Sequence, residues 1–188
     1  SYLIGLFSGD GKYRVLNRND GIIDADYYDR ERYQETFRAI FDELRDEGLF
    51  ERTIPEIRNS DLFKLSPFKS LNHEQAIAVE DILEGLFHDL GTERRTVSVI
   101  QGAPGTGKTI VAIYLIKLLQ DIADRPRTED LERDSMFAEF FADGYAELLA
   151  GRRIGFVIPQ QSLRVSVQRV FKKTPGLHPS MVLTDRKS

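Results

Sequence analysis

Hydrophobic residues in two stretches of the chain recur every three or four positions, which is the spacing of one helical face. This spacing predicts a helix over residues 29–47, where Gly48 is a natural stop, and another over residues 72–90, closed by Gly91. The expected buried face of the second helix consists of Ala76, Val79, Ile82, Leu83, Leu86 and Phe87.

Short apolar runs alternate with helical patterns in the second half of the chain. We predict strands at residues 96–101, 154–158 and 181–184, and helices at residues 108–120 and 161–171. Alternating strands and helices are typical of a parallel sheet with right-handed crossovers. The helix at 108–120 is apolar on most of its circumference, so we expect other elements to cover it on both sides. The expected fold class is α/β, a parallel sheet flanked by helices.

The N-terminal region has a different pattern. Residues 2–8 and 12–16 are strand-like and flank the turn sequence Gly9-Asp10-Gly11, which predicts a β-hairpin. Residues 52–70 contain two prolines and are expected to form an irregular connection.

We therefore expect two parts. Residues 1–70 form a small α+β extension of a hairpin and a helix, and residues 71–188 form the main α/β domain. Within the main domain, residues 125–150 carry aromatic side chains at helical spacing with a break at Gly144. This segment is predicted to be a helical insertion that packs on the main body.

The composition narrows the class of protein. Hydrophobic residues make up 41% of the chain and include 12 Phe and 7 Tyr, which is enough for a core. There is no cysteine, so disulfides and thiolate metal sites are excluded, and the three histidines are scattered. No apolar run reaches the length of a membrane span, and the N-terminus has no signal-peptide pattern. A cytoplasmic protein without a membrane partner is the expectation.

Charge is distributed unevenly along the chain. Residues 151–188 hold eight Lys or Arg against one Asp, a net charge of +7, whereas the whole chain has a net charge of −4. The remaining residues therefore carry −11. A basic end on an acidic body indicates a polyanionic partner near that end, and a solvated basic face is the alternative.

The sequence VIQGAPGTGKT contains the Gly-x-x-x-x-Gly-Lys-Thr pattern of a P-loop at residues 102–109. Its glycines let the backbone curl so that N–H groups point at phosphate oxygens, and the following helix presents its positive end to the same anion. Lys108 is expected to reach the β- and γ-phosphates, and Thr109 to bind Mg²⁺, which makes these two residues the catalytic candidates. The candidate residues for nucleotide binding in this loop are Gly102, Pro104, Gly105, Thr106, Gly107, Lys108, Thr109 and Ile110.

Two further segments carry weaker signals. Asn72 and Gln75 at the start of the second helix form a capping box, and Gln75 is also suited to bind adenine, because its amide both donates and accepts hydrogen bonds.

The polar turn after the strand at 154–158 is the second of these segments. Gln160, Gln161, Ser162 and Arg164 are candidates to bind a nucleic-acid backbone, because ligands of open α/β sheets lie at the carboxyl ends of strands. An ordinary strand-to-helix turn capped by Ser162 is the alternative.

Together, the segment LNHEQ, the P-loop and the turn PQQSL resemble the first three motifs of a superfamily 1 helicase. The run VIPQQSLRVSVQRVFKKTPGL is similar to the Schlafen group 3-like DNA/RNA helicase domain family. The resemblance covers about residues 71–184, and only the P-loop is specific on its own.

The resemblance implies a RecA-like P-loop NTPase that couples hydrolysis of ATP, with Mg²⁺, to movement on single-stranded DNA or RNA. Gln75 would contact adenine, the P-loop would hold the triphosphate, and Gln161 and Ser162 would contact the strand. No apolar strand ends in Asp-Glu, so we expect the domain to be truncated before the Walker B strand, with a second motor domain elsewhere in the full protein. The fragment alone is then expected to be catalytically incompetent.

Three alternatives remain open from the sequence. The chain could be a generic P-loop ATPase or a phosphotransferase without nucleic-acid coupling, in which Asp185 would hold Mg²⁺. It could also be a nucleotide-gated interaction module whose helical insertion binds a partner.

Overall fold

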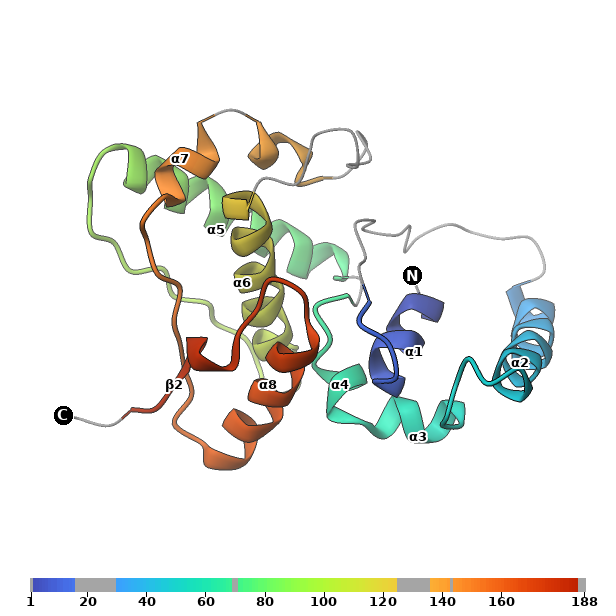
Figure 1. The fold of residues 1–188 in the computed structure, drawn as a ribbon. Coiled ribbons are helices and arrows are strands. Elements are labelled where there is room, and N and C mark those ends of the chain that lie inside the picture. Colours follow the sequence, from blue (N-terminus) through green and yellow to red (C-terminus); the bar gives the residue numbers. More distant parts are fainter. Residues whose placement is uncertain (1, 16–29, 69–70, 125–135, 143, 186–188) are drawn as a thin grey trace.

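The structure is a computed structural model that describes residues 2–15, 30–68, 71–124, 136–142 and 144–185. Among the described residues, four α-helices form an N-terminal group beside a larger group that holds four α-helices, two 3-10 helices (η2 and η3) and a two-stranded sheet (Figure 1). The N-terminal helices are α1 (Tyr2–Asp10), α2 (Arg30–Asp46), α3 (Ile54–Asn59) and α4 (Asp61–Lys64). The larger group contains α5 (His73–Gly91), α6 (Lys108–Asp124), η2 (Ala138–Phe141), α7 (Tyr145–Leu149), β1 (Phe156–Val157), α8 (Gln161–Lys173), η3 (Pro179–Met181) and β2 (Val182–Leu183).

The predicted N-terminal hairpin is wrong, because residues 2–10 form helix α1. Gly9 lies so close to α3 and α4 that an added Cβ atom would be 2.7 Å from the Ile57 Cγ2 atom and 2.7 Å from the Phe63 Cβ atom. The glycine therefore serves close helix packing instead of a hairpin turn. Gly11, with a φ of +77°, follows the end of the helix in the left-handed conformation that glycine favours. Part of the second predicted strand, at Leu16, lies outside the described residues.

The connection at residues 52–70 is more regular than predicted, because it contains α3 and α4. The Thr53 hydroxyl and backbone N–H both donate to the Glu56 carboxylate at 2.7 Å, which fixes the start of α3. The Ser60 hydroxyl oxygen accepts from the Phe63 backbone N–H and so caps α4. Local capping thus forms two short helices that carry little hydrophobic periodicity.

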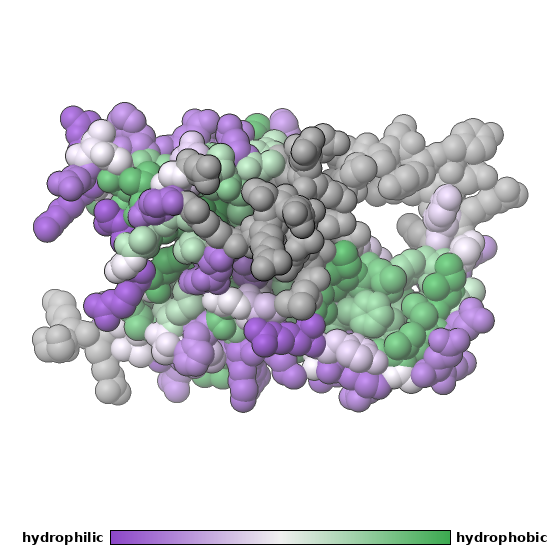
Figure 2. All heavy atoms as spheres, turned by 45° about the horizontal axis from the view of Figure 1, so that its top comes forward, coloured by the Kyte–Doolittle hydropathy of each residue, from purple (hydrophilic) through white to green (hydrophobic). Residues whose placement is uncertain are grey.

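The N-terminal helices share a core of their own. The predicted helix at 29–47 is confirmed as α2, and it contributes Phe41 to this core. The other buried members are Leu6, Phe50, Ile57 and Phe63. Hydrophobic side chains also gather on the surface over these helices, at the right of Figure 2. The exposed ones include Tyr2, Tyr33 and Ile40, at 44%, 63% and 46% exposure.

The larger group is built around α5 and α6, and both predicted helices are confirmed. One side of α6 packs with α5 and the insertion, and the other side packs with α8 and the sheet, as its apolar circumference predicts. The insertion is helical where the structure describes it, and Gly144, with a φ of +105°, separates η2 from α7 as predicted. Residues 125–135 and Asp143 lie outside the description.

The only sheet in the described part of the chain is a parallel pair, in which Phe156 is opposite Val182 and Val157 is opposite Leu183. Helix α8 connects the two strands, so one predicted strand–helix–strand unit is confirmed. The RecA-like sheet as a whole stays a prediction.

The predicted strand at 96–101 is not a strand in the structure. These residues run as a long loop between α5 and α6 (Figure 1), and Val97 and Val99 are 88% and 73% exposed. A strand depends on hydrogen bonds from a neighbouring strand. The described sheet consists of β1 and β2 alone and offers this segment no such neighbour.

Candidate functional site

The P-loop lies where the exposed segment 96–101 enters helix α6. Gly105 and Gly107 have φ values of +83° and +84°, so both occupy the left-handed region in which a side chain would be strained. Helix α6 begins at Lys108, immediately after this turn, and is 17 residues long. The backbone therefore changes direction at the two glycines and presents the N-terminus of a long helix to the loop.

Two glycines of the loop also lie close to neighbouring side chains. A Cβ atom on Gly102 would lie 2.8 Å from the Thr106 hydroxyl oxygen, and one on Gly107 would lie 2.5 Å from the Gln75 Nε2 atom. Nothing lies within 4 Å of a Cβ atom built on Gly105, so the need for glycine there is conformational. The sequence predicted glycines for phosphate approach, and the structure adds a contact with helix α5 at Gly107.

Lys108 is directed at its own loop. Its Nζ donates to the carbonyl oxygens of Gly102 at 2.7 Å and Ala103 at 2.9 Å. The Thr106 hydroxyl donates to the same Ala103 oxygen at 2.9 Å. These bonds hold the ammonium over the curled backbone, next to the position that a phosphate would take. Ala103 was missed in the sequence because it acts through its carbonyl, which leaves no side-chain signal.

Gln75 uses both ends of its side-chain amide. Its Oε1 accepts from the Asn72 backbone N–H at 3.1 Å, and its Nε2 donates to the Thr106 carbonyl at 3.0 Å. The Asn72 side chain in turn accepts from the Gln75 backbone N–H at 2.8 Å, so the predicted capping box is confirmed. The structure thus brings Gln75 against the P-loop, 31 residues away in sequence, whereas its contact with adenine stays a prediction.

The loop and the start of α6 fit a phosphate chain. The first backbone N–H groups of a helix have no partner inside it, and here they follow a curled, glycine-rich turn with a cation beside it. For Mg²⁺, Thr109 offers one half-buried hydroxyl. The described residues contain no cluster of three or more His, Asp or Glu that could hold a metal. The remaining ligands would therefore come from phosphate oxygens and water.

The polar turn after β1 lies at the carboxyl end of that strand, and Gln160, Gln161 and Ser162 are all exposed there. Arg164 is half-buried, and its guanidinium donates to the carbonyl oxygens of Ile158 at 2.8 Å and Pro159 at 3.3 Å. Arg164 therefore stabilises the turn from inside. The N-cap residue of α8 is Gln160, whose side chain makes no capping hydrogen bond, and Ser162 lies inside the helix.

One contact was not foreseen from the sequence. The Asp61 carboxylate of α4 accepts from the Ser166 hydroxyl at 2.7 Å and lies 3.9 Å from the Arg169 guanidinium. Both partners belong to α8, about a hundred residues further along the chain. The amino-acid sequence alone carries no signal for a contact between residues so far apart along the chain.

A family model described as "Type III restriction enzyme, res subunit" matches residues 68–176, more than half of the chain. The match spans Gln75, the P-loop and the turn before α8, which are the three segments brought out above. The chain belongs to this family. Comparison with curated proteins and with solved structures gave no significant match.

Type III restriction enzyme res subunits carry a P-loop helicase-like domain of the superfamily 1 and 2 kind. The predictions of a helicase-type ATPase and of a nucleic-acid partner agree with this family, because its domain is an ATPase of the helicase type and generally binds nucleic acid. In the described part of the chain, no helix is both long and apolar enough to cross a bilayer.

Proposed function

We propose that this chain is the ATP-binding portion of an ATP-dependent helicase or translocase that moves on single-stranded DNA or RNA. The observation that carries the proposal is the Gln75–Thr106 contact, which joins a capped helix to a glycine-rich P-loop inside the matched family region. We further propose that the chain is a Schlafen group 3-like helicase, and the similarity of residues 157–177 to that family supports this placement.

In this proposal the triphosphate lies along Gly102–Gly107 and against the N-terminus of α6. Lys108 would exchange its two loop carbonyls for β- and γ-phosphate oxygens, which is a favourable exchange because hydrogen bonds between ions are stronger than those to neutral carbonyls. Thr109 would hold Mg²⁺, which screens the phosphate charge. Gln75 would position the loop through Thr106 and lie near the base.

The turn of Gln160, Gln161 and Ser162 would contact the backbone of a single strand. Amide and hydroxyl groups suit phosphate and sugar contacts, which position a protein on nucleic acid without reading its sequence. Helix α8 follows β1 and precedes β2 along the chain, and it packs against α6 through Val167 and Phe171. A change at the nucleotide end of α6 could therefore reach the strand-binding turn through packed side chains.

The test is a titration of a fluorescent ATP analogue with Mg²⁺, with ATP and GTP as competitors, on the wild type and on Lys108→Ala. We expect ATP to compete better than GTP and Lys108→Ala to lose most of the affinity, because the ammonium is the principal cation at the loop. A Lys117→Ala variant is the control, since Lys117 lies on the same helix and pairs with Asp121. Binding that survives in Lys108→Ala would overturn the ATP site.

A second candidate is a generic P-loop ATPase or phosphotransferase that does not read the base. The engagement of both ends of the Gln75 amide by Asn72 and Thr106 favours it, because only one N–H and one oxygen lone pair are then left for adenine. Equal competition by ATP and GTP, together with no effect of single strands on nucleotide affinity, would select this candidate.

A further inference from the structure

The exposed side of helix α8 forms a polar and basic stripe. Gln161, Val165, Arg169 and Lys173 follow one another at spacings of four residues, Lys172 lies next to Lys173 in sequence, and all five are exposed. The opposite side of the helix is buried in the core through Val167, Val170 and Phe171. The stripe therefore starts at the turn that we propose to contact nucleic acid and becomes cationic toward the end of the helix.

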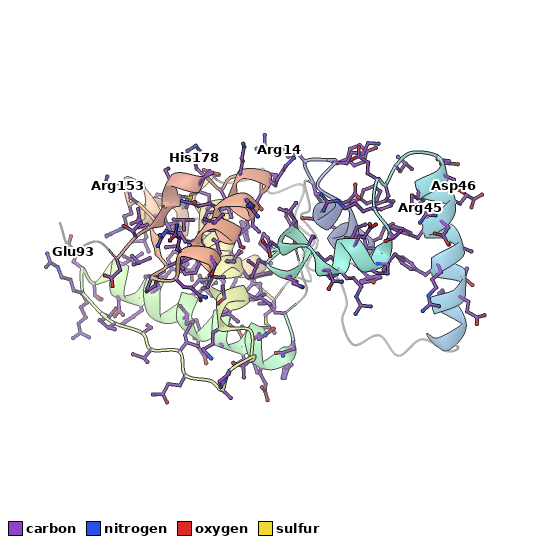
Figure 3. All side chains as sticks on the ribbon, turned by 90° about the horizontal axis from the view of Figure 1, so that it is seen from below. Arg14, Arg45, Asp46, Glu93, Arg153 and His178 are labelled. Carbon is purple, nitrogen blue, oxygen red and sulfur yellow. The ribbon has the colours of Figure 1, made fainter. Side chains whose placement is uncertain are left out.

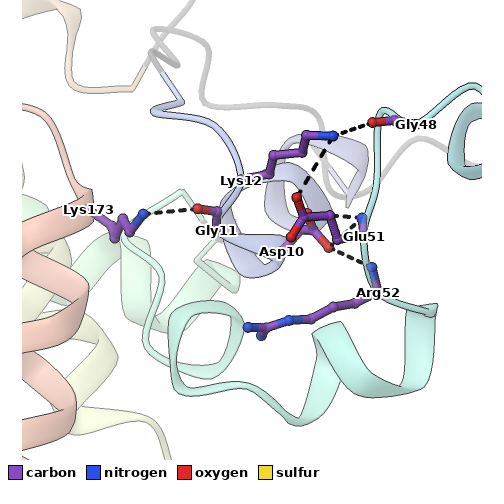
Figure 4. A network of polar contacts seen from close by, with 7 residues as sticks. All are labelled: Asp10, Gly11, Lys12, Gly48, Glu51, Arg52 and Lys173. Carbon is purple, nitrogen blue, oxygen red and sulfur yellow. Dashed lines mark hydrogen bonds and ion pairs between the residues drawn. The ribbon is translucent and has the colours of Figure 1, made fainter.

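The basic end of this stripe meets the N-terminal group of helices. The Lys173 Nζ atom donates to the Gly11 carbonyl at 3.0 Å (Figure 4). The Arg169–Asp61 pair and the Ser166–Asp61 bond hold the same two parts together about one and two turns earlier in α8, respectively. The segment 11–15 thus begins where the stripe of α8 ends.

Segment 11–15 continues the positive charge. Lys12 and Arg14 are both exposed, and Tyr13 between them is 40% exposed. Lys12 lies over the Tyr13 ring, 5.7 Å from its centroid, and its only described ion pair is a long 3.9 Å contact with Glu51. Arg14 has no ion pair among the described residues, and Figure 3 shows it near the junction of the N-terminal helices with α8.

The acidic side chains at this junction are already engaged. The buried Asp10 carboxylate accepts from the backbone N–H groups of Glu51 and Arg52, at 3.0 Å for the latter (Figure 4). Asp61 is occupied by Ser166 and Arg169. Lys172 and Lys173 also offset the negative end of the α8 dipole, which is their structural role. The exposed cations nevertheless outnumber the acids that could neutralise them.

We propose that this strip, Gln161–Lys173 of α8 continued by Lys12, Tyr13 and Arg14, is a track for the backbone of single-stranded nucleic acid. It rests on the proposed function and extends it to the N-terminal group of helices. Helix α8 spans 13 residues, or about 20 Å at ~1.5 Å per residue. The strip has the two features of a sequence-independent single-strand site, a line of cations and an aromatic ring on which a base can stack.

The test compares two variants that each remove two positive charges. Arg14→Gln with Lys172→Gln changes the strip, and Arg38→Gln with Arg58→Gln changes α2 and α3. All four side chains are exposed and have no ion pair among the described residues. Anisotropy of labelled oligo-dT and oligo-U of about 12 nucleotides, within the usual site size, is measured over a series of salt concentrations. Melting curves and affinity for a fluorescent ATP analogue check that each variant is folded.

The logarithm of the binding constant falls as the logarithm of the salt concentration rises, and each phosphate contact on a single strand contributes about 0.7 to the steepness. We expect this dependence to be shallower by about 1.4 in the strip variant, which loses two contacts. Between 50 and 200 mM salt, the affinity of the wild type should therefore fall by a factor roughly seven times larger than the affinity of the strip variant. The control variant should keep the wild-type slope. Comparison of dT with U shows which sugar the strip accepts.

Equal slopes for the two variants would overturn the track, as would displacement of the oligonucleotide by polyglutamate at the same charge concentration. A wild-type chain that binds neither oligonucleotide overturns the track and the proposed function together. Gln160→Ala separates the two ideas, because Gln160 is exposed in the turn and lies outside the strip. If that variant binds like the wild type while the strip variant is weakened, the track stands and the proposed contact at the turn fails.

Discussion

Gln75 and Asn72 make a matched pair of residues for separating helix capping from nucleotide binding. Each takes part in the capping box, but Gln75 alone also donates to the Thr106 carbonyl of the P-loop. The two side chains therefore share one structural task, and only one of them contacts the candidate site.

We predict that Asn72→Ala and Gln75→Ala each lower the free energy of unfolding by about 1 kcal/mol, the usual cost of losing such a cap. Only Gln75→Ala should weaken binding of an ATP analogue, because it also releases Thr106. Urea denaturation and analogue titration of the two variants measure both effects. Equal nucleotide affinity in the two variants would show that Gln75 acts as a cap alone.

Glu56 gives a prediction about pH. Hydrogen bonds from the Thr53 hydroxyl and then from the Thr53 backbone lower the pKa of its carboxyl, and Arg52 and Arg45 add smaller effects in the same direction. A lowered pKa in the folded chain means that the ionised carboxylate stabilises α3 above the pKa of the unfolded chain, about 4.3. That stability is lost as the pH falls through the lower pKa of the folded chain.

Glu56→Gln should therefore melt below the wild type at neutral pH, and the difference should shrink as the pH falls below the ordinary glutamate pKa of about 4.3. Glu35→Gln, a change in an exposed glutamate on α2, is the control and should show no such convergence. A constant difference in melting temperature across the pH range would contradict the assigned cause.

At the scale of elements, two helical glycines have opposite surroundings. Gly9 in α1 is pressed against Ile57 and Phe63, whereas an added Cβ atom on Gly85 in α5 would have nothing within 4 Å. Replacing glycine by alanine within a helix favours the helix by about 0.5–1 kcal/mol when space allows, and overpacking costs about 1–3 kcal/mol.

We predict that Gly85→Ala raises the free energy of unfolding and that Gly9→Ala lowers it, each by about these amounts. Neither change should alter binding of an ATP analogue, since neither glycine contacts the P-loop. Chemical denaturation of the two variants checks the signs. A stabilising Gly9→Ala would mean that α1 does not pack closely on α3 and α4.

Comparing these glycines with the long helices shows which parts of the fold could be predicted from the sequence. Helices α2, α5, α6 and α8 were predicted because each has a long apolar stripe, and the P-loop was predicted because its residue types follow from phosphate chemistry. The glycines of α1 look the same in sequence whether they serve a turn or a close contact. Which one applies depends on Ile57 and Phe63, some fifty residues away.

At the scale of the whole molecule, the segment 96–101 shows a second limit of the sequence. Its alternating valines favour a strand, but a strand forms only where another strand offers hydrogen bonds. The turn at Gly105 and Gly107 forms although the preceding strand does not, because it depends on the conformation of its own glycines and on the Gln75–Thr106 bond instead of on a sheet.

The contact of Asp61 with Ser166 gives a prediction about how the two helical groups are joined. In a double-mutant cycle, Asp61→Ala and Ser166→Ala should be coupled by about 0.5–1.5 kcal/mol, the usual value of one hydrogen bond. Urea unfolding of the wild type, both single variants and the double variant supplies the four values. Additive effects would mean that the Ser166–Asp61 bond adds nothing to the junction, which would then be held by the Arg169–Asp61 pair, Lys173 and packing.

The position of Lys108 has a consequence for how quickly and tightly a nucleotide is captured. The ammonium already bonds to the carbonyl oxygens of Gly102 and Ala103. Under the proposed role of Lys108, only the fraction of molecules in which Lys108 has left those carbonyls would be competent, and the apparent affinity would be the intrinsic affinity reduced by that fraction. Whatever draws Lys108 outward would thereby act as an activator without touching the nucleotide.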